Sequence, residues 1–442
     1  MRKNLKVLST VSSMLCTCIL FCGVPVHAAD ANADALPGGV FVEANEDSET
    51  GYTVTFRYYN ENATNVQVAG GFDFYEENAD YAYGYGAKLD EGDSTGDHLF
   101  KPETWSKDAN LYHVNDQATI IDMQQDEDGA WTCTLDLTGG WYLYQYNVSY
   151  NDANYYESVT DPENQPSCNS IGAHQTRSQF YVPYDAEKQA PQDDWTWSTP
   201  AEKEEDRGTL YQTSYMSADN IVRPVEVYLP ASYDADREEP YKVLYISHGG
   251  GGEEGDWVYQ GHAGNIVDRL TAEGTCDPFI IVAMNNSQFS WDYDAIYDNT
   301  KNYLIPFIEE NYNVSKEASG RAFAGLSMGG MTTSELLFRD QELFGYYGIF
   351  SGSAAFDLPE QDDYSSYETP DIYLAAGWAD MAYMNDSYQT ETDRTTTGLA
   401  DKFDELGIEY NDGNGIEVVQ GGHDWFTWPQ ILRDYVTTTL WK

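Results

Sequence analysis

The stretch RAFAGLSMGG, residues 321–330, places a serine between two glycines at the end of an apolar run. The residues before the serine favour a short buried strand, and residues 331–339 favour a helix. Gly-x-Ser-x-Gly between a strand and a helix is typical of a strained turn that lifts the serine hydroxyl above the edge of a sheet. Gly325 and Gly329 suit such a turn because bulky side chains would clash there. We therefore predict that Ser327 is a nucleophile.

A serine hydroxyl becomes a good nucleophile only when a base removes its proton. Where this turn occurs, the acid and then the histidine follow the serine along the chain. Of the seven histidines, only His423 follows Ser327. It lies in GGHDW, residues 421–425, directly after an apparent strand at 416–419. We predict that His423 is the general base.

The acid of such a triad has to lie between the serine and the histidine, where this chain has many carboxylates. Asp380 is preferred because it follows an apolar run at 371–376 and a turn at 377–379, which places it at the end of a strand. Its expected role is to orient His423 and to stabilise the imidazolium. Asp386 is the second candidate.

A glycine-rich turn, HGGGG at residues 248–252, follows an expected strand at 242–246. Turns at this place supply a backbone amide to the oxyanion, together with the amide of the residue after the serine. The expected donors are Met328 and either Gly249 or Gly250, whereas His248 is expected to be a structural hydrogen-bonding residue. A phosphate-binding loop is disfavoured because the Gly-Lys-Ser/Thr ending is missing. We expect no metal and no organic cofactor.

Two folded regions are expected. In residues 38–185 the alternating runs and glycine turns favour an all-β sandwich. Residues 186–207 are rich in proline and charge, as linkers are. In residues 208–442 strands alternate with helices, which predicts a mostly parallel sheet with helices on both faces. Together with the serine turn, this favours an α/β-hydrolase fold. The expected elements are strands at 52–59, 131–137, 141–148, 225–229, 242–246 and 279–284, and helices at 266–272 and 300–310.

The charge balance and the first residues predict where the protein acts. With 74 acidic against 23 basic residues the net charge is −51, so nucleic acid and anionic membranes are poor partners. A basic start, an apolar stretch at 11–24 and the sequence VHA at 26–28 predict a secretory signal peptide over residues 1–28. The protein is therefore expected to be extracellular. The three cysteines beyond residue 28 are widely spaced, so no disulfide framework or zinc site is indicated.

The motifs at 248–252, 325–330, 377–380 and 421–425 together resemble the carbohydrate esterase family that contains feruloyl and acetylxylan esterases. The resemblance covers residues 208–442 and implies Ser327, His423 and Asp380 as the triad. The first region is similar to immunoglobulin-like domains grouped with glycogen-binding modules, through residues 129–131, 139–146 and 161–164. Such modules occur in front of feruloyl esterases, which implies a role on a sugar polymer.

Together these features predict a secreted serine esterase that hydrolyses hydroxycinnamate esters on plant arabinoxylan. Acetylated xylan is the alternative substrate. Two other classes stay open, an acyltransferase with the same triad and a non-catalytic polysaccharide-binding protein. Three tryptophans are expected to contact the substrate, namely Trp291, Trp378 and Trp425.

Overall fold

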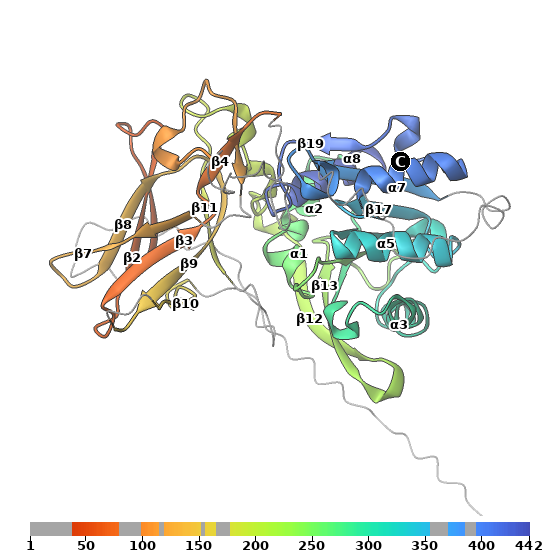
Figure 1. Ribbon diagram of the computed structural model, residues 1–442. Helices are drawn as coiled ribbons and strands as arrows, with labels where there is room; N and C mark the ends of the chain where they lie inside the picture. The colour runs from red at the N-terminus through yellow and green to blue at the C-terminus, as the bar shows by residue number, and fades with distance from the viewer. Residues whose placement is uncertain are drawn as a thin grey trace, which may run out of the picture.

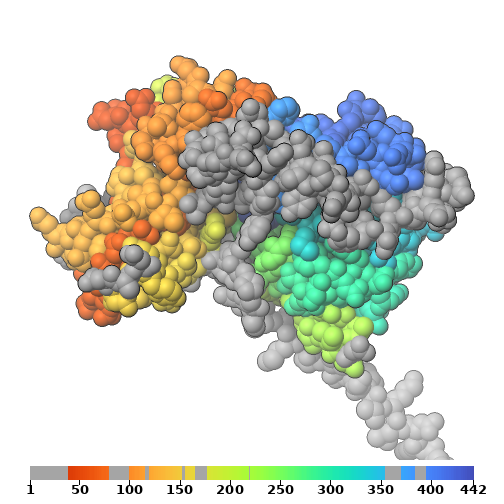
Figure 2. Space-filling model, viewed as in Figure 1, coloured from red at the N-terminus to blue at the C-terminus, as the bar shows by residue number. Residues whose placement is uncertain are grey.

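The computed structural model describes residues 38–78, 99–114, 119–151, 155–164, 177–353, 370–384 and 395–442. The expected signal peptide and Asp386 lie outside these residues. A β-rich domain, coloured red to yellow, lies beside an α/β domain, coloured green to blue (Figures 1 and 2). In the described part of the chain, no helix has both the length and the apolar character needed to cross a bilayer.

The β-rich domain consists of two main sheets that share one core. The strand orders are β1-β2-β8-β7 and β10-β9-β3-β6, with β11 also paired to β9, while β4 and β5 form a separate two-stranded sheet. The predicted sandwich is thereby confirmed. The strands are β1 Gly39–Ala44, β2 Tyr52–Tyr58, β3 Asn65–Gly70, β4 Asp73–Glu76, β5 Leu111–Val114, β6 Thr119–Asp122, β7 Gln124–Gln125, β8 Trp131–Asp136, β9 Gly140–Ser149, β10 Glu157–Val159 and β11 Ser178–Val182.

Alternation along the strands explains the core of this domain. On β9 every second side chain is buried, from Tyr142 through Tyr144 and Tyr146 to Val148. On β2 of the other sheet, Val54 and Phe56 are fully buried. Because successive side chains point to opposite faces of a strand, these residues meet between the two sheets.

The α/β domain is built on an eight-stranded sheet of order β12-β13-β15-β14-β16-β17-β18-β19. The first two pairings are antiparallel, and those from β15 to β19 are parallel. This arrangement confirms the predicted α/β class. The strands are β12 Thr209–Met216, β13 Val222–Leu229, β14 Val243–Ser247, β15 Ile280–Met284, β16 Arg321–Leu326, β17 Tyr346–Phe350, β18 Asp371–Gly377 and β19 Glu417–Val419.

Helices cover both faces of this sheet (Figure 1). One core includes residues of α3, α4, α5 and α7, and the opposite core includes residues of α1, α2 and α8. The central strands β14 and β15 are buried along their whole length, as expected for strands covered on both faces. The helices are α1 Asp256–Tyr259, α2 Ala263–Ala272, α3 Tyr293–Asn299, α4 Ile305–Asn311, α5 Met328–Arg339, α6 Met381–Met384, α7 Thr396–Leu406 and α8 Trp428–Thr438.

The segment between the domains is packed rather than extended through solvent. Trp195 is buried in the core of the β-rich domain, and Ser198 is fully buried. The Ser198 carbonyl accepts a hydrogen bond from Asn265 of α2, and Arg269 donates to Thr199. Residues 186–207, expected to be a linker, therefore contact both domains.

Candidate active site

Ser327 occupies the turn between β16 and α5. Its backbone has φ 52° and ψ −118°, a conformation that is strained for a residue with a side chain. The turn is narrow, because a Cβ added at Gly325 would lie 2.4 Å from the carbonyl group of Gly329. The Ser327 amide donates to the Phe350 carbonyl at 2.9 Å, which fixes the turn to the next strand. A side chain held in this way projects from the carboxyl edge of the sheet.

His423 and Asp380 come from two neighbouring strands of the same sheet. Asp380 follows β18, and His423 follows β19, which pairs with β18 in parallel. The imidazole Nδ1 lies 2.9 Å from Asp380 Oδ1, and Nε2 lies 2.9 Å from Ser327 Oγ. A carboxylate only accepts, so Nδ1 donates to Asp380 and Nε2 accepts from the serine hydroxyl. The structure thus brings all three predicted residues into one hydrogen-bonded chain, with Asp380 fully buried.

The glycine loop after β14 lies against the serine turn. A Cβ added at Gly249 would lie 3.3 Å from Ser327 Cβ, and one at Gly250 would lie 2.8 Å from Met328 Sδ. Met328 is the first residue of α5, so its amide is among those that have no partner within the helix. The positive end of the helix dipole points to the same place. The expected oxyanion donors therefore lie next to the serine, and their role in binding the oxyanion stays a prediction.

His248 holds the glycine loop in place. Its Nδ1 donates to the Gly249 carbonyl at 2.7 Å, and its Nε2 accepts from the Asn286 amide at 3.1 Å. Burial lowers the pKa of His248 to about 4, because desolvation disfavours the charged ring. A neutral imidazole with both nitrogens engaged fits the structural role expected for this residue.

The three tryptophans expected at the substrate occupy different places. The Trp291 ring meets His248 edge-on at 5.6 Å, so it lies beside the glycine loop. The Trp425 ring meets those of Trp257 and Trp428 edge-on at 5.4 and 5.0 Å, which makes it part of the support behind the histidine loop. Trp378 lies 6.0 Å from the ring of Tyr383. Their contact with substrate stays a prediction.

Two features of the site and its surroundings were not predicted from the sequence. The Trp428 ring meets His423 edge-on at 5.2 Å, and its Nε1 donates to Ser351 Oγ at 3.0 Å. Its place after the GGHDW motif was the only available signal.

The second feature is Glu226 on β13, whose buried carboxylate oxygens have no hydrogen-bond partner among the described residues. Burial, and then the charges of Glu254, Glu253 and Asp256, raise the pKa of Glu226 to about 8. A single acidic residue inside the apolar run 225–229 was its signal.

The sequence and the structure are similar to those of known esterases. The family profile named Esterase matches residues 220–438. An endo-1,4-beta-xylanase/feruloyl esterase of Xylanibacter ruminicola is 30% identical over 253 residues, which cover 54% of this chain and 32% of that protein. Endo-1,4-beta-xylanase Y of Acetivibrio thermocellus is 26% identical over 207 residues, which cover 42% of this chain and 19% of that protein. The matches therefore span a third or less of these relatives.

One solved structure resembles both domains together. The crystal structure of the enterobactin esterase of Shigella flexneri aligns with 90% of this chain and 96% of its own, with a TM-score of 0.51 and 16% identity. At this identity the likeness concerns the fold, a β-rich domain in front of an α/β-hydrolase domain.

Proposed function

We propose that this protein is a secreted serine esterase that cleaves hydroxycinnamate esters on plant arabinoxylan, because residues 220–438 match the esterase family profile. The observation that carries the proposal is the hydrogen-bonded chain from Ser327 through His423 to Asp380, with 2.9 Å at each step. The relative whose name includes feruloyl esterase supports the substrate class.

The reaction is acyl transfer to water in two halves. Ser327 Oγ attacks the ester carbonyl while its proton moves to His423 Nε2, and the amides of Met328 and of Gly249 or Gly250 stabilise the oxyanion. The tetrahedral intermediate collapses, and His423 returns the proton to the departing sugar hydroxyl. A water then gives its proton to His423 and attacks the acyl-enzyme, which releases the acid and restores Ser327. Asp380 orients His423 and stabilises the imidazolium.

The test compares ester hydrolysis by the protein without residues 1–28 on methyl ferulate, feruloylated arabinoxylan and acetylated xylan. Ferulate release is expected, and Ser327→Ala should reduce it by about 10⁴-fold or more, because the residual rate would come from binding and the oxyanion donors alone. Release of acetate alone would move the substrate to acetylated xylan while the triad stands. Equal hydrolysis rates for the wild type and Ser327→Ala on all three substrates would overturn the esterase proposal.

The acyltransferase alternative differs only in the second half of the reaction. An excess of acceptor alcohol would then give a new ester instead of free acid. Covalent labelling of Ser327 by a fluorophosphonate separates both enzymes from a non-catalytic polysaccharide-binding protein, which would not be labelled faster than Ser327→Ala.

A further inference from the structure

The loop that carries His423 inserts a side chain into the other domain. Phe426, three residues after His423, is 2% exposed and belongs to the hydrophobic core of the β-rich domain. Its ring lies 5.3 Å from Trp195 and 5.9 Å from Tyr142, edge-on to each. A residue of the α/β domain therefore completes the core of the domain that precedes it.

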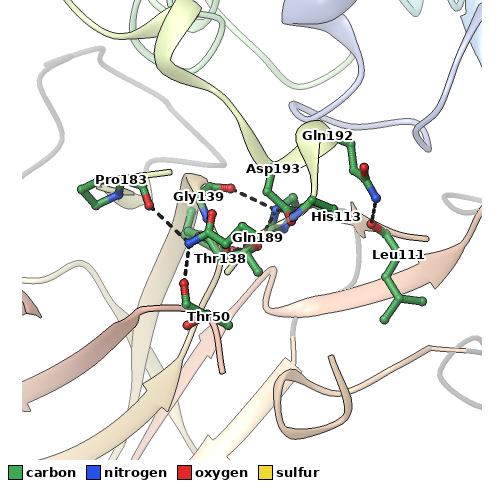
Figure 3. A network of polar contacts seen from close by, with 11 residues as sticks. Thr50, Leu111, His113, Thr138, Gly139, Pro183, Gln189, Gln192 and Asp193 are labelled. Atoms are coloured by element: carbon green, nitrogen blue, oxygen red, sulfur yellow. Dashed lines mark hydrogen bonds and ion pairs between the residues drawn. The ribbon is translucent and has the colours of Figure 1, made fainter. Parts of the chain in front are cut away.

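The closest aromatic partner of Phe426 is His113 on β5, with ring centroids 4.4 Å apart and an angle of 10° between the planes. A buried polar network holds this imidazole (Figure 3). Its Nε2 lies 3.1 Å from the Gly139 carbonyl and 3.5 Å from the Asp193 carboxylate, and its Nδ1 lies 3.3 Å from the Tyr142 hydroxyl. Because both nitrogens have polar neighbours, the ring plane is fixed and forms a firm surface for Phe426.

The same network reaches into the segment between the domains. Gln189 accepts from the Gly139 amide at 2.8 Å and donates to the Thr50 carbonyl at 2.7 Å. Asp193 accepts from the Ala190 amide at 3.1 Å. The support behind His113 is thus tied to the scaffold of the β-rich domain on several sides.

A second set of contacts reaches both triad loops from the two-stranded sheet β4–β5. Gln420, three residues before His423, donates to the Asn78 side chain at 2.8 Å and accepts from the Asn78 amide at 3.3 Å. Ala379, directly before Asp380, is fully buried and packs with Tyr75 of β4 and Val114 of β5. The acid loop therefore packs on this small sheet, and the histidine loop bonds to Tyr75 of the sheet and to Asn78, two residues beyond β4.

We propose that the β-rich domain positions the catalytic triad, with Phe426, His113 and the β4–β5 sheet as the positioning elements. The inference rests on the esterase function proposed above, and it gives the first domain a role in the reaction that does not depend on glycan binding. Proton transfer requires Nε2 to stay within hydrogen-bond reach of Ser327 Oγ. A displacement of about 1 Å at such a site can cost about 100-fold in rate.

The test compares two substitutions in one hydrophobic core. Phe426→Leu removes the stacked ring. Phe56→Leu removes a fully buried phenyl group from the same core, whose ring partners among the described residues are Phe72, Tyr144 and Phe180. Both should lower the thermal midpoint. Only Phe426→Leu should lower kcat on methyl ferulate, by about 10- to 100-fold, with KM within about two-fold of the wild-type value. Gln420→Ala, in a half-buried loop position, should lower kcat by a few-fold and serves if Phe426→Leu does not fold.

Two results would overturn the positioning role. One is that Phe426→Leu, assayed well below its melting temperature, has the kcat of wild type. If Phe426→Leu does not fold, the same result for Gln420→Ala counts instead. The other is an equal loss in Phe56→Leu. The second-order rate of Ser327 labelling by a fluorophosphonate gives the same comparison without any ester substrate. Wild-type labelling no faster than that of Ser327→Ala would overturn the esterase and the positioning role together. Rapid wild-type labelling that Phe426→Leu leaves unchanged would overturn the positioning role alone.

Discussion

Replacing Asp380 by asparagine should slow the enzyme without moving the histidine. Asp380 Oδ1 accepts two hydrogen bonds, from His423 Nδ1 at 2.9 Å and from the Ala382 amide at 2.7 Å. Asp380 Oδ2 is buried and has no hydrogen-bond partner among the described residues. Because two N–H groups converge on one oxygen, Asp380→Asn should keep its amide oxygen there and turn its NH₂ group to the Oδ2 side. The imidazole then keeps the tautomer that accepts from Ser327.

What the substitution removes is the negative charge beside the imidazolium that forms in the transition state. Two unit charges about 4 Å apart interact by ~4 kcal/mol at the effective dielectric constant of ~20 that suits protein sites. At about 1.4 kcal/mol for each factor of ten, the expected loss is about 10³-fold in kcat. KM should change little, because the carboxylate does not contact the substrate in the proposed mechanism.

The assay is the steady-state hydrolysis of methyl ferulate by Asp380→Asn and by Asp386→Asn, from pH 5 to pH 9. Asp386→Asn is the matched control, since Asp386 was the second candidate from the sequence, and it should retain wild-type kcat. A kcat of Asp380→Asn within ten-fold of wild type, or an equal loss in Asp386→Asn, would refute the reasoning.

Three further outcomes follow from the site and its surroundings. The folded state keeps the proton of Glu226 up to about pH 8, whereas the unfolded chain loses it near pH 4.5, so this residue lowers stability as pH rises across that range. Glu226→Gln should therefore be more stable than wild type, and the difference in free energy of unfolding should grow from pH 5 to pH 8 to ~3 kcal/mol. A difference that does not depend on pH would contradict this. Gly329→Ala would put a Cβ 2.5 Å from the carbonyl oxygens of Ser247 and His248, so kcat should fall more than ten-fold. Gly274→Ala has no atom within 4 Å but a φ of 72°, so it should lose some stability and keep full activity. With a net charge of −51, hydrolysis of de-methylated pectin should be slow at low ionic strength and rise with added salt, and a rate that salt leaves unchanged would contradict the charge argument.

Local patterns were enough to predict the architecture of both domains. The strand predicted from the alternation at 52–59 is β2. The strand predicted from the continuous apolar run at 279–284 is β15, which is buried along its length. Side-chain period and run length report burial on one or two faces of a strand, and this information is local. The elbow around Ser327 could be predicted for the same reason, because its strand, turn and helix lie within 19 consecutive residues.

The acid of the triad was harder to predict, because the sequence of a loop does not determine the path that the loop takes between two strands. Asp380 and Asp386 both follow the same apolar run, and only the pairing of β18 with β19 brings the Asp380 carboxylate to His423. Such a pairing joins residues about 40 positions apart, beyond the reach of any period-based argument. For the same reason, the sequence did not predict that Glu226 is buried.

The insertion of Phe426 into the β-rich domain shows most clearly what a sequence pattern cannot report. In GGHDWF an aromatic residue after the predicted base has a local explanation, as part of the loop or of the substrate pocket. Its actual partner, His113, lies more than 300 residues earlier, in the short strand β5. An apolar side chain in a sequence predicts burial, but it does not predict which residues it will contact, since the hydrophobic effect is non-directional. The contact between the domains must therefore come from the three-dimensional arrangement, and at Phe426 it lies three residues from the proposed base.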